Sequence, residues 1–230
     1  LSHITSPTAL RLPVAEICKL AAEKGILTVI DGAHAPGQIP IDMETIGADF
    51  YFGNAHKWMC SPKGAGFLFT RPERQHLIEP LVVGWGWGED RTFTYGSDYL
   101  DTLQWLGTND LSAYLAVPAA IKFQEMNDWP SVRQECHKLL REALRKTSRL
   151  TGIPPSYPDD DDYCQMAVAR LPILGDLAEF KARLYREYRI EVPCIEWQDQ
   201  QFIRLSLQAY NHAEDVDALV GALTTLLGER

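Results

Sequence analysis

The sequence has no apolar stretch long enough to cross a bilayer. Its longest apolar runs, residues 64–69 and 115–121, fall far short of the roughly 20 residues that a spanning helix needs. The N-terminus also lacks the basic segment and the apolar core of a secretory signal. It begins with Leu1 instead of methionine, so we expect the natural protein to start further upstream. These absences predict a protein with no membrane partner.

Positive charge and cysteine are also scarce. The chain has 22 lysines and arginines against 31 acidic residues, for a net charge of -9, and it contains no basic block. A nucleic-acid backbone would be repelled, so we expect no nucleic-acid partner. The five cysteines form no CxxC pair and no metal-type spacing, which is typical of a reducing compartment. We therefore predict a cytoplasmic protein with free thiols and no metal site.

The sequence is nevertheless long and apolar enough to bury a core, since 46% of its 230 residues are hydrophobic. An amphipathic helical pattern runs from Pro13 to a stop signal at Gly25. Residues 26–30 then form a β-branched apolar run, which is typical of a parallel strand covered on both faces. Strand patterns recur at 49–52 and 64–69, so the first half predicts an α/β fold with a mainly parallel sheet.

The second half of the sequence changes character. A long helical pattern over residues 118–149, with a break expected near Pro130, suits a connection between two lobes. Strand and helix patterns then alternate over 164–171, 177–188, 190–193 and 202–207, before a final helix that ends near 227. We predict a first domain over 1–117 and a second over 118–230, made of the connecting helix and a small α+β lobe. The acidic tract at 159–162 is able to bind a cation, but we interpret it as a solvated turn.

Polar residues suited to a cofactor follow two of the predicted strands. Asp31 and His34 come after the first strand, and Asn54, His56 and Lys57 follow the second, where ligands bind in α/β sheets. A carboxylate there can keep a pyridine nitrogen protonated, as pyridoxal phosphate requires. A lysine whose pKa is lowered by burial can form a Schiff base with that cofactor. Taken singly, Asp31 is equally typical of a turn cap and Lys57 of a solvated surface, but their combination favours a cofactor pocket.

Longer segments carry a resemblance to a known family. They are SHITSPTALRLPVAEI at 2–17, VIDGAHAPG at 29–37, GADFYFGNAHKW at 47–58, PKGAGFLF at 62–69, QWLGTND at 104–110 and FIRLSLQAYNHAEDVDAL at 202–219. Almost end to end, the sequence resembles the class V, fold-type I pyridoxal-phosphate enzymes, which include cysteine desulfurases, kynureninases and isopenicillin N epimerase. The resemblance implies that 1–117 is part of the cofactor-binding large domain, whose upstream portion with the cofactor-stacking residue is missing. It implies that 118–230 holds the small C-terminal domain.

The resemblance also implies roles for single residues near the cofactor. Lys57 would carry pyridoxal phosphate as the internal aldimine, and Asp31 would pair with the ring nitrogen. His34 would lie near the phenolic oxygen of the cofactor. Asn54 and His56 would help to hold its phosphate.

Two further residues are implied to act from more distant parts of the chain. The turn at Gly107 and Thr108 resembles the segment that reaches the cofactor phosphate of a neighbouring subunit, which implies a homodimer with shared active sites. Arg204 resembles the clamp for the carboxylate of an amino-acid substrate, and a bidentate guanidinium suits that group. Without the resemblance, Arg204 would be interpreted as an arginine on the surface of a strand.

The reaction is less closely defined than the family. Desulfurases need a nucleophilic cysteine upstream of the arginine clamp, and Cys194 is the candidate here, but it follows a predicted strand and we interpret it as structural. GNAHKW, VVGWGWG, GTND and EVPCIEW are closer to isopenicillin N epimerase-like proteins, in a group that also includes aminotransferase-like enzymes and carbon–sulfur lyases. Trp85 and Trp87 suit either a substrate pocket or a packed loop. A non-catalytic binding or assembly module is the alternative to an enzyme.

Overall fold

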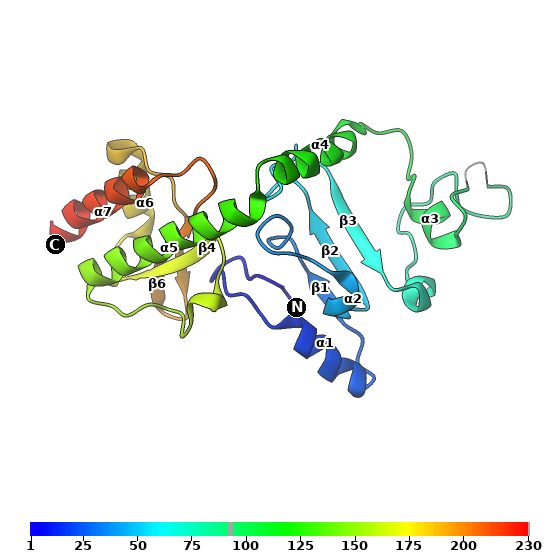
Figure 1. Cartoon of the computed structure of the whole chain (residues 1–230), viewed down its shortest axis with the longest axis horizontal. Coiled ribbons are helices and arrows are strands. Elements are labelled where there is room, and N and C mark those ends of the chain that lie inside the picture. Colours follow the sequence, from blue (N-terminus) through cyan, green and yellow to red (C-terminus); the bar gives the residue numbers. More distant parts are fainter. Residues whose placement is uncertain (92–93, 230) are drawn as a thin grey trace.

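Two small sheets organise the chain, each in its own lobe (Figure 1). The computed structural model describes residues 1–91 and 94–229. The first lobe holds both the N-terminus and the strands β1 to β3, and the second holds β4 to β6 and the C-terminus. Two consecutive helices connect the lobes in Figure 1: α4 lies at the top of the first lobe, and α5 slopes down from it through the second.

The first sheet consists of β1 (Val29–Asp31), β2 (Phe50–Asn54) and β3 (Gly66–Thr70), in that order. β1 pairs with β2 in parallel, and residue 2 forms an isolated parallel bridge to the other edge of β1. β3, however, runs antiparallel to β2. The α/β fold is therefore as expected, but this part of the sheet is mixed, because an apolar run predicts a strand without predicting its direction.

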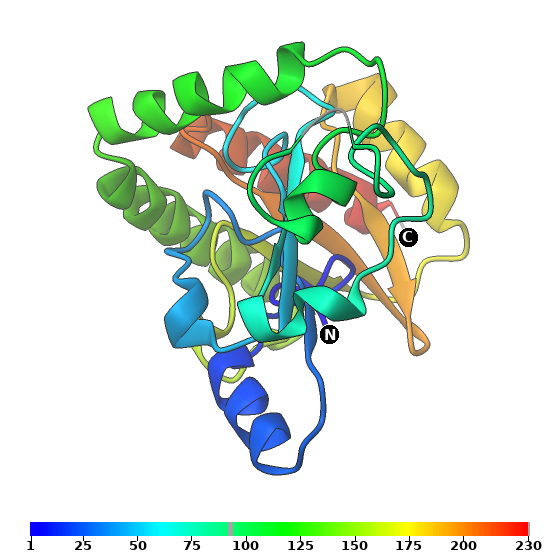
Figure 2. The ribbon, with the colours of Figure 1, turned by 90° about the vertical axis from the view of Figure 1, so that its right-hand side faces the viewer.

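Helix α1 (Val14–Glu23) confirms the helical pattern that was predicted after Pro13. Pro13 occupies the N-cap, where its missing N–H costs no helical hydrogen bond, and Gly25 follows the helix with a φ of 67°. The buried face of α1 packs on the sheet, together with the short helix α2 (Met43–Ile46). In the view turned by 90°, α1 and α4 lie at opposite ends of the first lobe (Figure 2).

The connection between the lobes is two helices, α4 (Ser112–Met126) and α5 (Trp129–Thr151), instead of one. The break lies where the sequence predicted it, because Pro130 occupies the first turn of α5, a position that tolerates proline. Pro118 lies inside α4, so the predicted domain boundary at 117 falls within a helix. That boundary stays a prediction. A 3-10 helix (Pro72–Leu77) and α3 (Asp98–Leu103) precede α4.

The second sheet is antiparallel, with strand order β4–β6–β5. Its strands are β4 (Met166–Leu171), β5 (Cys194–Trp197) and β6 (Gln200–Ser206), and α6 (Leu177–Tyr188) and α7 (Ala213–Gly228) complete the lobe. Alternate strand residues pack with α5, α6 and α7 in one core. The predicted strand at 190–193 was wrong. Residues 194–197 form the strand instead, because the turn at 198–199, with two positive φ angles, folds them back onto β6.

A smaller apolar cluster joins the two lobes. Its members are Ile4, Ala9, Ala35, Ile39 and Trp58 from the first lobe, and Cys164 and Met166 from the second. Since residues from both lobes share this core, it packs the loops of the first lobe against the start of β4 in the second.

Chain-wide features agree with the sequence. All five cysteines are free thiols in the structure. The helices within residues 1–91 and 94–229 include none that is both long and apolar enough to cross a membrane. The acidic tract forms a capped 3-10 turn (Asp160–Asp162), in which Asp160 pairs with Arg141.

Gly32, directly after β1, is expected to tolerate no side chain. A Cβ atom there would lie 2.2 Å from the ring of Tyr51, which is fully buried. We expect Gly32→Ala to lower the free energy of unfolding by about 1–3 kcal/mol, as overpacking does. Gly221→Ala is the matched control, because that glycine lies inside α7 and no atom of the described residues lies within 4 Å of its Cβ position.

The control substitution should raise stability by roughly 0.5–1 kcal/mol, because alanine favours a helix more than glycine does. Urea titrations of both variants measure the two effects. A Gly32→Ala variant as stable as the unmodified chain would contradict the packing described here.

Candidate active site

The ends of β1 and β2 bring the predicted site residues together. These two strands are parallel, so their carboxyl ends, Asp31 and Asn54, lie at the same edge of the sheet. His34 follows Asp31 in a tight turn, and Lys57 follows Asn54 by three residues. Lys57 Nζ lies 3.3 Å from His34 Nε2. The two segments therefore meet at this edge of the sheet, and their common role as one site stays a prediction.

His34 is held as a neutral imidazole. Burial, together with the positive charges of Lys57 and Arg204, lowers the pKa of His34 to about 4, and the carboxylate of Asp31 opposes that shift only in part. Its second ring nitrogen, Nδ1, lies 3.3 Å from Nε1 of Trp58. Both nitrogens of the ring are thus in contact with a neighbour.

Lys57 is half-buried, and its pKa is lowered from its ordinary value. Burial is the main cause, and the charge of Arg204 adds to it, whereas the carboxylate of Asp31 acts in the opposite direction. A lowered pKa increases the fraction of free amine, which is the nucleophilic form of a lysine. The site therefore favours covalent chemistry at Lys57 Nζ.

The Asp31 carboxylate keeps part of its hydrogen-bonding capacity. Oδ1 accepts a hydrogen bond of 2.8 Å from the backbone N–H of Ala33, and the described residues provide no further hydrogen bond to the carboxylate. An ionised carboxylate can accept several hydrogen bonds, so the group can receive a protonated nitrogen from a bound molecule.

Asn54 has an unused polar atom at the same edge of the sheet. Its Oδ1 is buried and has no hydrogen-bond partner among the described residues. A buried amide oxygen without a partner costs free energy, so a group that completes the site would relieve that cost. The oxygen and nitrogen of an amide exchange places by a simple flip, so the same position can offer a donor. His56, two residues on, is half-buried.

Arg204 reaches the site from the second lobe. It lies on β6, opposite Val168 of β4, and its Nη1 donates to the backbone oxygen and the hydroxyl of Ser6, at 2.5 and 3.3 Å. Burial lowers its pKa, and its Nε is buried with no partner in the described part of the chain. Its charge acts on both His34 and Lys57. A guanidinium with a donor that has no partner among the described residues therefore lies near enough for its charge to act on the lysine.

The other predicted residues are not part of this cluster. Thr108 is exposed between α3 and α4, and it forms no hydrogen bond with the cluster within the described residues. Cys194 lies within β5, not after a strand as predicted, and burial raises the pKa of its thiol to about 11. A protonated thiol in a strand is a poor nucleophile. Trp85 and Trp87 are mostly exposed in the loop before α3.

Sequence reasoning missed a chain of buried glutamines beside the site. Gln38 Nε2 donates to the His34 carbonyl at 2.6 Å, and Gln38 Oε1 accepts from the Gln165 N–H at 2.9 Å. Gln165 Nε2 lies 3.3 Å from Gln208 Oε1, and Gln208 Nε2 lies 3.6 Å from Cys60 Sγ. These contacts tie the second lobe to the segments that carry His34 and Lys57. No local pattern reveals them, because Gln38 and Gln165 are 127 positions apart.

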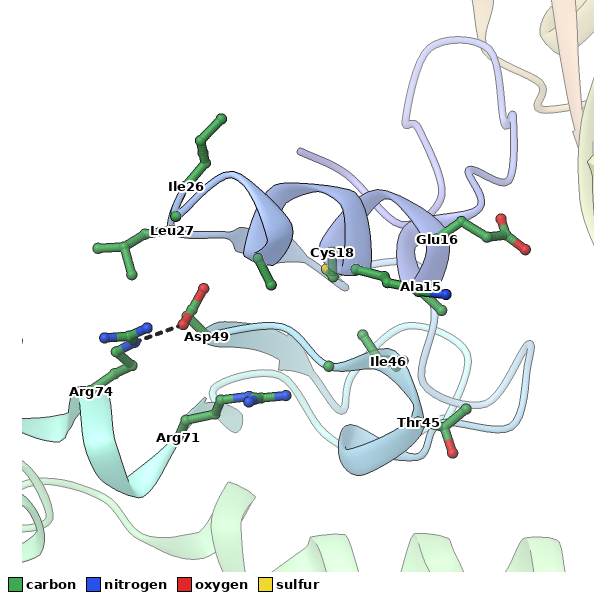
Figure 3. A pocket seen from close by; sticks show the side chains of 14 residues that line it. Ala15, Glu16, Cys18, Ile26, Leu27, Thr45, Ile46, Asp49, Arg71 and Arg74 are labelled. Carbon is green, nitrogen blue, oxygen red and sulfur yellow. Dashed lines mark hydrogen bonds and ion pairs between the residues drawn. The ribbon is translucent and has the colours of Figure 1, made fainter.

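A separate surface pocket of about 510 Å³ lies between α1, α2 and the residues after β3 (Figure 3). Arg74 forms an ion pair of 2.8 Å with Asp49 at its wall, and Arg71 lies beside them. None of the clustered residues Asp31, His34, Lys57 and Arg204 lines this pocket. The candidate active site at the strand ends is therefore a different site from the pocket in Figure 3.

Comparisons with known proteins agree with this geometry. Residues 1–219 match the family described as Aminotransferase class-V. Isopenicillin N epimerase from Streptomyces clavuligerus is 37% identical over 99% of this chain, and the match covers 60% of that protein. L-cysteine desulfhydrase from Arabidopsis thaliana is 27% identical over 100% of the chain and 54% of that protein. The chain thus spans about three fifths or less of the length of these relatives.

Solved structures share the fold at low sequence identity. A cysteine desulfurase from Thermococcus onnurineus NA1 matches with a TM-score of 0.83 and 20% identity, over 100% of this chain and 59% of that one. An alanine–glyoxylate aminotransferase from Nostoc sp. matches with a TM-score of 0.75 and 20% identity, over 99% of this chain and 60% of that one. These similarities establish the arrangement of both lobes.

Proposed function

The chain belongs to the class V aminotransferase family, and on that premise we propose that the whole protein is an enzyme acting at the α-carbon of an amino acid or an amino-acid-derived substrate. Pyridoxal phosphate, the cofactor of this family, supplies an electron sink when it is bound. The observation that carries the proposal is the cluster in which Asp31, His34 and Arg204 all act on Lys57, a lysine whose pKa is lowered.

The residues at the strand ends fit this cofactor. Lys57 Nζ would hold it covalently, and the unused acceptor capacity of Asp31 would receive the protonated ring nitrogen. His34, neutral and next to Lys57, would hydrogen-bond to the phenolic oxygen. Asn54 and His56 would hold the phosphate. The buried Oδ1 of Asn54 has no partner among the described residues, and an amide flip would place the NH2 donor there, which supports its part in that role.

Arg204 would bind the substrate carboxylate. Its Nε has no partner within residues 1–91 and 94–229, whereas its Nη1 is anchored on Ser6, so the guanidinium is oriented with a donor still unused. A carboxylate accepts two parallel hydrogen bonds from such a fork. The free amine of Lys57 would remove the α-proton of a bound substrate as general base.

Epimerisation is the outcome that we favour among the reactions that share this proton transfer. The similarity of 37% to an isopenicillin N epimerase supports it. The second candidate is carbon–sulfur bond cleavage, supported by the similarity of 27% to an L-cysteine desulfhydrase. A desulfurase mechanism is disfavoured, because the thiol of Cys194 is half-buried in β5 and its pKa is raised.

The assembly and location of the protein are also proposed. We infer a homodimer in which Thr108, exposed in this chain, contacts the cofactor phosphate of the partner subunit. We further propose a cytoplasmic enzyme with a first domain over 1–117 and a second over 118–230. Its relatives are longer, so a non-catalytic module is the alternative. Pyridoxal-phosphate affinity, measured for this chain and for the natural full-length protein, discriminates between the two.

A panel of amino acids in deuterated water tests the proposed reaction. The full-length protein, loaded with pyridoxal phosphate, is expected to exchange the α-proton for deuterium with no loss of the amino group, which NMR and chiral chromatography would detect. Release of pyruvate and sulfide would instead favour the lyase, and keto-acid formation would favour transamination. Absence of α-proton exchange with every amino acid and amino-acid-derived peptide would reject the proposed function.

A further inference from the structure

Trp58, the residue after Lys57, is fixed in place by its surroundings. Its side chain is only 8% exposed and packs in the apolar cluster between the lobes. Its backbone oxygen accepts a hydrogen bond of 3.1 Å from Gln124 Nε2 on α4. Trp58 is therefore held through its backbone and by the packing of its side chain, and its Nε1 donates to His34 Nδ1 over 3.3 Å.

This contact determines which nitrogen of His34 carries the proton. The N–H of an indole donates a hydrogen bond and cannot accept one, so Nδ1 must present its lone pair. The proton of the neutral ring then stands on Nε2. His34 is kept neutral by burial and by the positive charges of Lys57 and Arg204, with Asp31 as the only opposing charge that acts on it among the described residues. Gln38 fixes the backbone of the same residue through its carbonyl.

The protonated Nε2 of His34 in turn constrains Lys57. It lies 3.3 Å from Lys57 Nζ, and an N–H at that distance is satisfied only by an acceptor. An ammonium group has three N–H donors and no lone pair, whereas a free amine has a lone pair that can accept the hydrogen bond. The arrangement is therefore complementary to the free amine of Lys57 and not to its protonated form.

We propose that Trp58 is a positioning residue: its indole N–H sets the tautomer of His34, so that the Nε2 proton of His34 faces Lys57 and favours the lysine as a free amine. This inference rests on the proposed function in one respect only: the free amine of Lys57 has a role if Lys57 binds the cofactor. The tautomer itself depends on the contacts of this chain alone, so it can be tested independently of any activity.

The test is a long-range ¹H–¹⁵N NMR spectrum of the full-length protein with labelled histidine, assigned with a His34→Asn variant. We expect the His34 proton on Nε2 in the unmodified protein and a mixture of both tautomers in Trp58→Phe. Trp129→Phe is the matched control, because Trp129 is also buried, with 4% of its surface exposed, and its Nε1 donates to the Gly37 carbonyl at 3.2 Å. This control should leave the His34 tautomer unchanged.

A second readout follows the lysine. In Trp58→Phe, the apparent pKa for the reaction of Lys57 with pyridoxal phosphate should rise by about one unit, equivalent to about tenfold slower attachment near neutral pH. A proton on Nδ1 in the unmodified protein, a tautomer that persists in Trp58→Phe, or an equal change in Trp129→Phe would each overturn the inference. The first of these is read from the unmodified protein, without a substitution of Trp58. A correct tautomer in a protein that never binds the cofactor would retain the inference on Trp58 and reject the proposed function.

Discussion

Lys57→Ala is expected to abolish the visible absorption band of the lysine-bound cofactor and to lower kcat by at least about 10³-fold. The variant loses both the nucleophile that holds pyridoxal phosphate and the general base at the α-carbon, and a positioned base alone contributes about 10²–10⁴-fold. Absorption spectra of the loaded full-length protein, together with initial rates on its best substrate, measure both effects.

Lys63→Ala is the matched control for this experiment. Lys63 lies six positions further along the chain and is exposed. Its substitution should leave both the absorption band and kcat within twofold of the unmodified values, since exposed substitutions have small effects. An unchanged band in Lys57→Ala, or its loss in Lys63→Ala, would mean that the cofactor is held elsewhere.

Arg204→Gln is expected to raise KM for a carboxylate-bearing substrate with a smaller effect on kcat. Removing one partner of a buried, hydrogen-bonded charge pair costs about 2–5 kcal/mol, which corresponds to roughly 30-fold to a few thousand-fold in KM. The same variant should bind an amine analogue that lacks the carboxylate as well as the unmodified enzyme does. Steady-state kinetics and competition with the analogue separate the two contributions.

Arg170→Gln provides the control for charge and for strand position. Arg170 lies on β4, where it pairs with Phe202 of β6. Arg204 pairs with Val168, which is two residues before Arg170 on β4. It is half-buried, as Arg204 is, yet it has no part in the charges that act on Lys57. An increase in KM as large for Arg170→Gln as for Arg204→Gln would show that any positive charge on this sheet suffices, and that Arg204 is no specific clamp.

Much of the fold follows from local patterns in the sequence. The β-branched run before Asp31 predicted a strand, and the pattern after Pro13 predicted α1. The clustering of Asp31 with Lys57 also followed, because parallel strands end at a common edge of the sheet. These features depend on residues close together in the sequence, where periodicity and turn signals are informative.

The remaining features depend on contacts that no local pattern contains. Arg204 lies 198 positions from Ser6, and only the packing of the two lobes brings them together. The direction of β3 is likewise absent from its apolar run. The strand predicted at 190–193 was misplaced because apolar residues continue through Ile195, and the turn at 198–199 decides which of them pair with β6.

The role of Trp58 illustrates the difference between a motif and its mechanism. The tryptophan is visible in the sequence as the neighbour of Lys57, but its partner is the side chain of His34, 24 positions upstream. Lys57 and Trp58 lie in the bend and turn that follow β2, and there each contacts a different nitrogen of the His34 imidazole, Lys57 Nζ at Nε2 and Trp58 Nε1 at Nδ1. The contact that we propose to set the tautomer of His34 could therefore not be predicted from the sequence.

Chemical trapping of the cofactor tests the central claim, covalent attachment at Lys57, most directly. The full-length protein would be loaded with pyridoxal phosphate, reduced with borohydride and digested, and the modified peptide would be identified by mass spectrometry. We predict a stoichiometric phosphopyridoxyl group on Lys57, within the peptide that contains Trp58. A label confined to Lys63, or distributed over exposed lysines with none on Lys57, would contradict the account.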